Sequence, residues 1–124
     1  MTIRKQESRS EPVVEVELLL SDSSVPVVAA SEAEDCQFDL EEFIPRGEDR
    51  HVEFYSVEGG DPDAVTEMVA EHDARETQLL SRRGDAGLLE VLVSGDSPAM
   101  LLAEHGALPR RVAVDDGEMT IAAE

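Results

Sequence analysis

The sequence predicts an α+β domain in which an antiparallel sheet carries helices on one face. Runs of alternating apolar and polar residues, the period of a half-buried strand, recur through most of the chain. Helix-start signals stand at the evenly spaced prolines Pro26, Pro62 and Pro98. The resulting element order is βαββαβ followed by βαββ. We therefore expect a ferredoxin-like βαββαβ antiparallel sheet that is extended by a further βαββ unit.

The first strand is expected at residues 13–20, where valine and leucine alternate with acidic residues. Pro26 then fits the first turn of a helix, and the β-branched residues after it make this the weakest of the three helices. A second strand follows at residues 36–45. Its adjacent Glu41 and Glu42 interrupt the alternation, which indicates a bulge that shifts the face of the strand.

The third strand, at residues 51–57, is expected to form a hairpin with the second across the polar turn 46–50. Its alternation predicts that Val52 and Phe54 point into the core. A helix that begins at Pro62 carries the clearest apolar stripe in the chain. We regard it as the most secure of the helices.

The last part of the chain repeats the same signals. Strands are expected at residues 75–80 and 88–93, and a third helix begins at Pro98. Residues 110–114 and 118–122 then form two strands around an Asp-Gly pair, which is a strong hairpin signal.

The charge of the chain indicates a protein that lives in concentrated salt. Aspartate and glutamate number 29 against 10 basic residues, so the formal charge is −19 on 124 residues. Molar salt shortens the Debye length to about 3 Å and screens this self-repulsion. We therefore expect a protein of an extremely halophilic cytoplasm that requires high salt and has no direct contact with nucleic acid, whose phosphates it would repel. A disordered acidic tail or a nucleic-acid mimic is disfavoured because the carboxylates are interleaved with apolar residues.

Length and composition indicate one folded domain at residues 13–124, preceded by a mobile tail at residues 1–12. The lone Cys36 excludes an internal disulfide, and its expected state is a small buried side chain. No apolar run is long enough to cross a bilayer, and the start of the chain has no signal segment. The expected location is the cytoplasm, with no membrane contact.

The search for chemistry returns little. His51, His72 and His105 lie far apart, so none forms the helical pair of a zinc site. No nucleophile elbow, phosphate loop or dinucleotide fingerprint occurs. We therefore expect no enzyme, no catalytic residue, no metal and no cofactor. A hydrolase that uses Glu71 and His72 is kept as a minor alternative, although neighbouring helix residues point in different directions.

Four segments carry a resemblance to a known family. They are residues 13–20, residues 38–45 (Phe-Asp-Leu-Glu-Glu-Phe-Ile-Pro), residues 53–59 (Glu-Phe-Tyr-Ser-Val-Glu-Gly) and residues 61–65 (Asp-Pro-Asp-Ala-Val). In this order the chain resembles the N-terminal domain of haloarchaeal transcription regulators of the bacterio-opsin activator type. In that family, a strand with an aromatic pair and a glycine precedes an Asp-x-Asp-Ala helix.

The resemblance implies a sensory or regulatory domain that stands ahead of a DNA-binding helix-turn-helix. This sequence shows no helix rich in lysine and arginine that could serve as a recognition helix. We expect the regulatory part of such a regulator without the DNA-binding segment, either as a separate protein or as a fragment of a longer one. The expected partner is a protein, either a second copy or a full-length regulator.

A stand-alone module that binds a small molecule is the competing hypothesis. The ligand would lie at a junction between strand and helix, near His51, Tyr55, Gly59 and Gly60. Saturable ligand binding by the isolated domain would favour this hypothesis, and recovery of a DNA-binding partner would favour the regulatory one.

Overall fold

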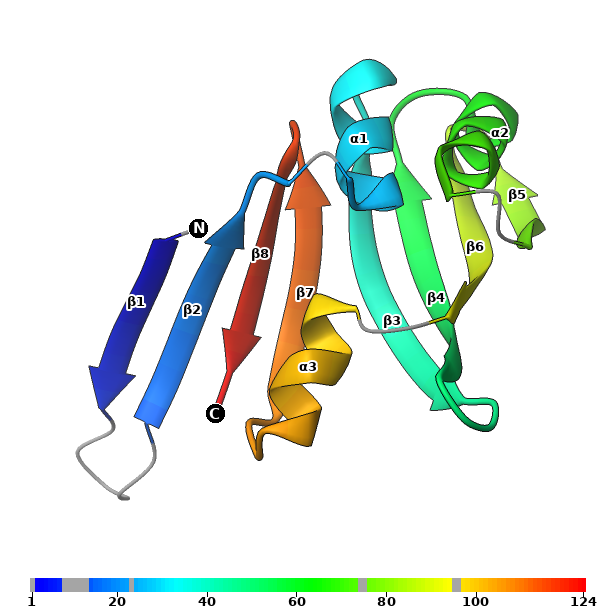
Figure 1. Cartoon of the computed structure of the whole chain (residues 1–124). Helices are drawn as coiled ribbons and strands as arrows, with labels where there is room; N and C mark the ends of the chain where they lie inside the picture. The colour runs from blue at the N-terminus through cyan, green and yellow to red at the C-terminus, as the bar shows by residue number, and fades with distance from the viewer. Residues whose placement is uncertain (1, 8–13, 23, 74–75, 95–96) are drawn as a thin grey trace.

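A computed structural model describes residues 2–7, 14–22, 24–73, 76–94 and 97–124. Within these residues, eight strands form one antiparallel sheet, and three helices lie against one of its faces (Figure 1). The strands are β1 (Thr2–Glu7), β2 (Val14–Leu20), β3 (Gln37–Pro45), β4 (Arg50–Glu58), β5 (Thr77–Arg83), β6 (Ala86–Ser94), β7 (Pro109–Asp115) and β8 (Glu118–Ala123). The helices are α1 (Pro26–Ala33), α2 (Pro62–Asp73) and α3 (Pro98–Glu104). The α+β class and the predicted order of elements are confirmed.

The strand order across the sheet is β1-β2-β8-β7-β3-β4-β6-β5. Strands β7 and β8 lie between β2 and β3, so the C-terminal hairpin separates the first strand of the predicted βαββαβ unit from the next. The predicted third unit therefore inserts its last two strands into the sheet and does not add them at an edge. The ferredoxin-like detail of the prediction is not confirmed. Alternation in a sequence shows which residues share a face of a strand, but it does not show which strand lies beside it.

The N-terminal segment differs from the prediction of a mobile tail. Residues 2–7 form β1, an edge strand that pairs antiparallel with β2 from Thr2 opposite Leu19 to Glu7 opposite Val14. Residues 8–12 of the predicted tail lie outside the described residues. Without β1, strand β2 would be an open edge of the sheet, and pairing with β1 gives its free backbone groups hydrogen-bond partners.

Both predicted hairpins are confirmed. Strands β3 and β4 pair with a register shift between Leu40 and Glu42, at the predicted bulge. Strands β7 and β8 meet at Asp116 and Gly117, whose φ angles of 48° and 76° are both positive. Positive φ at both central residues is typical of the type I′ turn that an Asp-Gly pair favours.

The face of β4 is opposite to the one predicted. His51, Glu53, Tyr55 and Val57 point to the helix-covered side, and all four are buried. Val52 is also buried, but it lies on the opposite face of the strand. The prediction that Val52 and Phe54 point into the core was wrong, because the helix-covered face of this strand carries the polar side chains of His51, Glu53 and Tyr55.

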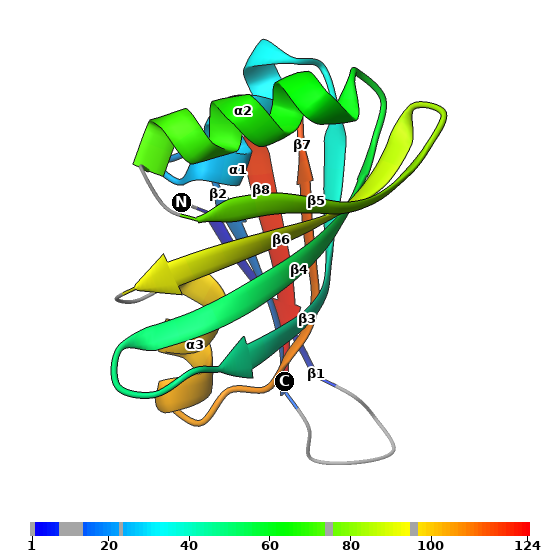
Figure 2. The same cartoon turned by 90° about the vertical axis from the view of Figure 1, so that its right-hand side faces the viewer.

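The sheet is strongly twisted, and β5 and β6 cross β7 and β8 at a steep angle (Figure 2). Helices α1 and α2 pack against each other, and α2 covers β5 and β6. Helix α3 stands apart from them and packs on β7. The core between these layers is aliphatic, apart from an edge-to-face contact between Phe38 and Tyr55 with ring centroids 6.0 Å apart.

Candidate functional site

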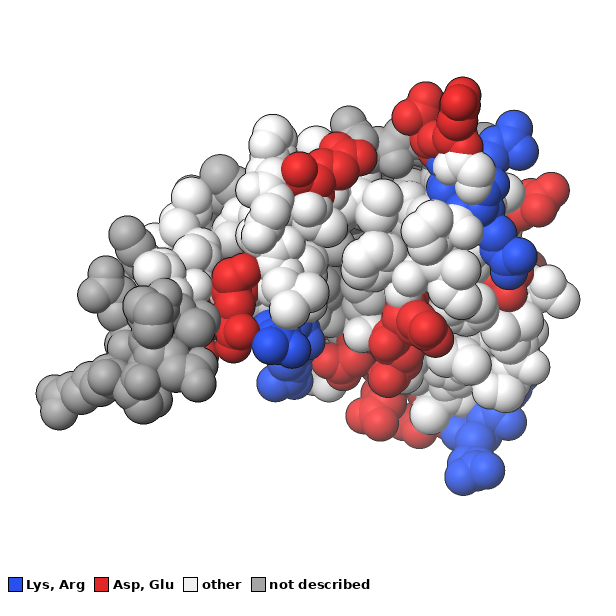
Figure 3. Space-filling view, turned by 90° about the horizontal axis from the view of Figure 1, so that it is seen from below, with Lys and Arg blue, Asp and Glu red and all other residues white. Residues whose placement is uncertain are grey.

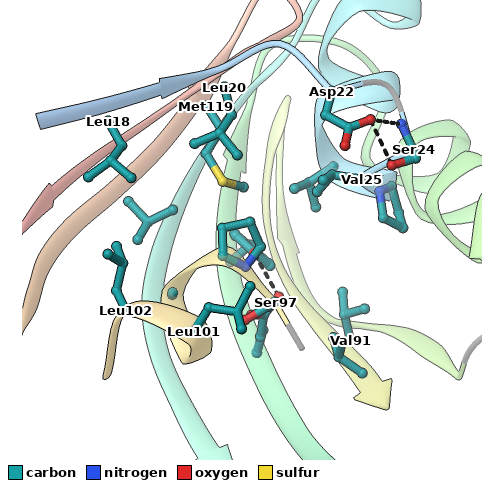
Figure 4. A pocket seen from close by; sticks show the side chains of 18 of the residues that line it. Leu18, Leu20, Asp22, Ser24, Val25, Val91, Ser97, Leu101, Leu102 and Met119 are labelled. Atoms are coloured by element: carbon teal, nitrogen blue, oxygen red, sulfur yellow. Dashed lines mark hydrogen bonds between the residues drawn. The ribbon is translucent and has the colours of Figure 1, made fainter. Parts of the chain in front are cut away.

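A cavity of about 540 Å³ lies on the helix-covered side of the sheet, between α1 and α3. Leu18, Leu20 and Met119 line it from the sheet, and Leu101 and Leu102 line it from α3 (Figure 4). The remaining apolar lining consists of Val25, Pro26, Val27, Val91, Val93, Pro98, Ala99 and Val112. Its volume is within the range of small-molecule sites.

The cavity exists because two short helices share a long stretch of sheet. Helix α1 has 8 residues and α3 has 7, and β7 contacts both of them. Pro26 begins α1 and Pro98 begins α3, and Ser97 caps α3 by accepting a hydrogen bond from the backbone N–H of Met100. The apolar side chains of β2, β6 and β8 between the helices therefore face the cavity.

Three polar side chains of β4 form a buried network at the wall of this cavity. The Tyr55 hydroxyl donates to Glu53 Oε1 at 2.7 Å, and His51 Nε2 lies 3.1 Å from Glu53 Oε2. His51, Glu53 and Tyr55 are 1 %, 6 % and 2 % exposed, respectively. They meet because residues two apart along a strand share a face. Glu53 and Tyr55 line the cavity, and His51 lies behind them against Phe43.

The network has a clear electrostatic consequence for the tyrosine. Burial raises the pKa of Tyr55 well above its ordinary value of 10, and the neighbouring Glu53 carboxylate raises it further through its charge and its hydrogen bond. The Tyr55 hydroxyl therefore remains a hydrogen-bond donor to Glu53. Transfer of an isolated carboxylate from water into a protein interior costs roughly several kcal/mol. The buried Glu53 carboxylate therefore needs its hydrogen-bond partners Tyr55 and His51.

The rim of the cavity is polar. Asp22 accepts hydrogen bonds from the backbone and the hydroxyl of Ser24, and these bonds lower the pKa of its carboxyl. His105 lines the cavity at the C-cap of α3. Within the described part of the chain, the charged residues that line the cavity are Asp22 and Glu53, and no lysine or arginine is among them.

The family described as "BAT: GAF and HTH_10 associated domain" matches residues 11–124. The chain belongs to the BAT domain family. This match confirms the resemblance to the N-terminal domain of bacterio-opsin activator-type regulators, and it indicates a regulatory role. No curated protein and no solved structure matches the chain.

The BAT domain brings together two of the four residues predicted to bind a ligand. His51 and Tyr55 meet through Glu53 at the cavity. Gly59 and Gly60 lie beyond the end of β4, where their backbones pass close to the chain between α1 and β3. A Cβ atom on Gly60 would lie 2.9 Å from the carbonyl oxygen of Glu34, so close packing explains this glycine.

The sequence analysis missed Glu53 and the cavity itself. A signal for Glu53 was present, because His51, Glu53 and Tyr55 alternate in a strand and together form a set of polar groups that can satisfy one another. The cavity left no signal, because its walls come from seven separate helices and strands of the BAT domain and from the segments between them.

Other candidate groups give no site. Cys36 is buried as predicted, and burial together with Glu34, Asp35 and Asp115 raises the pKa of its thiol to about 11. Glu71 lies near the end of α2, and the side chain of His72 is outside the described residues. Among the described side chains, no group of three His, Cys, Asp or Glu could hold a metal ion. No described helix is long and apolar enough to cross a membrane.

Proposed function

We propose that this BAT domain is the signal-receiving module of a transcription regulator, which binds a small molecule in the cavity between α1 and α3. The observation that carries the proposal is the cavity itself, a large aliphatic space with a buried, hydrogen-bonded carboxylate at its wall. Aliphatic walls with a few placed polar groups are typical of small-molecule sites. The module is non-enzymatic, since His51, Glu53 and Tyr55 support and orient one another.

The output of binding is a shift between two arrangements of α3. This helix packs on β7, whereas α1 also packs on α2, β3 and β8. A ligand that contacts α3 and the sheet together stabilises the arrangement in which both touch it, so the population of that arrangement rises. We propose that a protein partner, either a second copy or a regulator with a helix-turn-helix, recognises the arrangement.

The surface supports the choice of a protein partner without direct nucleic acid contact. With a charge of −19, the chain repels phosphate backbones. In the view from below, acidic groups are spread over the surface, and the basic groups stand in separate places (Figure 3). We propose that residues 13–124 act as one regulatory domain in the cytoplasm of a salt-accumulating cell, without a DNA-binding segment of their own. A stand-alone ligand-binding module is the alternative, and it would use the same cavity.

A substitution that fills the cavity tests this function. Ala99 lines the cavity and is 4 % exposed, so Ala99→Leu adds three carbon atoms to its wall. Ala103 lies on the same helix and is exposed, so Ala103→Leu is a matched control. We expect the chromosomal Ala99→Leu variant to change transcript levels as removal of the domain does, and Ala103→Leu to leave them unchanged.

The result also separates the two functions. Wild-type transcript levels in the Ala99→Leu strain, with the variant protein folded, would contradict a regulatory role of the cavity. The stand-alone module would then be the better description if the isolated domain still binds a small molecule.

A further inference from the structure

The composition of the cavity wall restricts the kind of molecule that fits. Leucine, valine, alanine, proline and methionine make up its apolar lining, and Tyr55 is its single aromatic residue among the described residues. Flat aromatic ligands gain from stacking on aromatic side chains, which this wall does not offer. A flexible aliphatic chain gains binding free energy simply by burying its apolar surface, and the apolar wall of this cavity can bury it.

Glu53 determines which hydrogen-bonding groups the head of the ligand must carry. An ionised carboxylate offers about four acceptor positions and no donor. Tyr55 and His51 occupy one position on each oxygen, so further positions remain. The Tyr55 hydroxyl already donates its hydrogen to Glu53. A ligand group that contacts Glu53 and Tyr55 must therefore donate a hydrogen bond.

Charge disfavours fatty acids and aliphatic phosphate esters, whose head groups are anionic. The cavity presents Glu53 at its wall and Asp22 at its rim, and no lysine or arginine of the described residues lines it, so His105 is its one basic side chain. A carboxylate or phosphate head would lose water and gain no lysine or arginine partner in return. It would also face the field of a chain with 29 acidic residues.

We infer that the cavity binds an aliphatic molecule with an uncharged or cationic head group that donates a hydrogen bond to Glu53, such as a long-chain alcohol. This inference rests on the proposed function, because it names the ligand class of the same cavity. It assigns Glu53, which the sequence analysis missed, as the residue that selects the ligand.

Three probes of nearly equal length test the class. 1-Octanol donates a hydrogen bond, 1-methoxyheptane has the same number of heavy atoms and only accepts, and octanoate is anionic. Calorimetric titration of the domain in molar KCl gives each dissociation constant. We expect 1-octanol to bind tighter than either of the others by about tenfold or more, the ratio that corresponds to one hydrogen bond of roughly 1.4 kcal/mol.

The chain itself supplies a reporter for the place of binding. It has 1 tyrosine and no tryptophan, so its fluorescence comes from Tyr55 at the cavity wall. We expect 1-octanol to change this fluorescence with the same dissociation constant that calorimetry gives. An unchanged Tyr55 signal at calorimetric saturation would place the probe elsewhere and overturn the inference.

Two variants on one strand test the role of Glu53. Glu53→Gln keeps the size of the side chain and replaces one acceptor oxygen by a donor, so the preference for 1-octanol over 1-methoxyheptane is expected to fall several-fold. Glu58→Gln on β4 is the control, because Glu58 is exposed and does not line the cavity. If Glu53→Gln does not fold, the wild-type comparison of the three probes still decides.

The failures are distinguishable. Equal or tighter binding of octanoate or 1-methoxyheptane, or no binding of 1-octanol, overturns the ligand class and leaves the transcript test of Ala99→Leu untouched. Selective binding of 1-octanol with unchanged transcripts in the Ala99→Leu strain supports the ligand class and contradicts the regulatory function.

Discussion

Tyr55 is the one tyrosine of the chain, and its hydrogen bond to Glu53 gives a direct test of the buried network. Burial and the adjacent carboxylate raise its pKa above the ordinary value of 10. We therefore expect the folded protein to show no tyrosinate absorbance at pH 10, where an unfolded chain would be half ionised. An ultraviolet titration in molar salt measures this directly.

The same shift predicts how stability depends on alkaline pH. Above pH 10 the unfolded state loses a proton that folded Tyr55 keeps, so the free energy of unfolding falls as the pH rises further. Tyrosinate absorbance and loss of circular dichroism are expected to appear together. Tyrosinate that forms near pH 10 in a protein with full circular dichroism would contradict the buried hydrogen bond to Glu53.

His51 and Tyr55 were predicted to lie near a ligand at a junction between strand and helix, and the structure places both in the buried network. The prediction that Val52 and Phe54 face the core placed Glu53 on the opposite face, where acidic residues are usually exposed. Its partners two residues away on each side reverse this preference, and only the folded structure shows that all three point inward.

Among the secondary-structure elements, α1 and the β7–β8 hairpin are joined by one buried hydroxyl. Ser31 in α1 is 0 % exposed, donates to the carbonyl oxygen of Val28 at 2.8 Å, and accepts from the backbone N–H of Gly117 at 2.9 Å. The bond to Gly117 joins parts of the chain that are far apart in sequence. It positions α1, one wall of the cavity, on the sheet.

Removal of this hydroxyl is expected to destabilise the domain. Ser31→Ala leaves the N–H of the partly buried Gly117 without its partner, which costs about 1–3 kcal/mol. Urea denaturation in molar KCl measures the change in the free energy of unfolding. Ser21→Ala, at an exposed position after β2, is the control and is expected to have little effect. Equal stability of the Ser31→Ala and Ser21→Ala variants would show that water replaces the lost bond.

Local signals predicted the elements well because they act over a few residues. Pro26, Pro62 and Pro98 mark the observed helix starts, and the bulge and both hairpins occur where the sequence indicated them. The neighbours of each strand depend on which hairpins pack side by side. The insertion of β7 and β8 between β2 and β3 is therefore a property of the whole sheet, and no local pattern encodes it.

The charge of the whole molecule predicts a dependence on salt. At 0.1 M salt the Debye length is about 10 Å and the carboxylates repel one another, whereas at 1 M it is about 3 Å. We expect the free energy of unfolding to rise steadily with KCl over this range. Sucrose at matched osmolality is the control, because it does not screen charge. A stability that responds equally to both solutes would contradict an electrostatic origin.

The position of β8 also determines when the chain can fold. Val16 of β2 pairs with Ala123 of β8, so these neighbouring strands join residues that are far apart in the sequence. Contacts of such high sequence separation require closure of a long loop and slow the folding of a domain. During synthesis, β2 has to wait on the ribosome until β8 has emerged. We therefore expect the domain to fold only after β8 is available, so the cavity cannot hold a ligand before that strand has emerged.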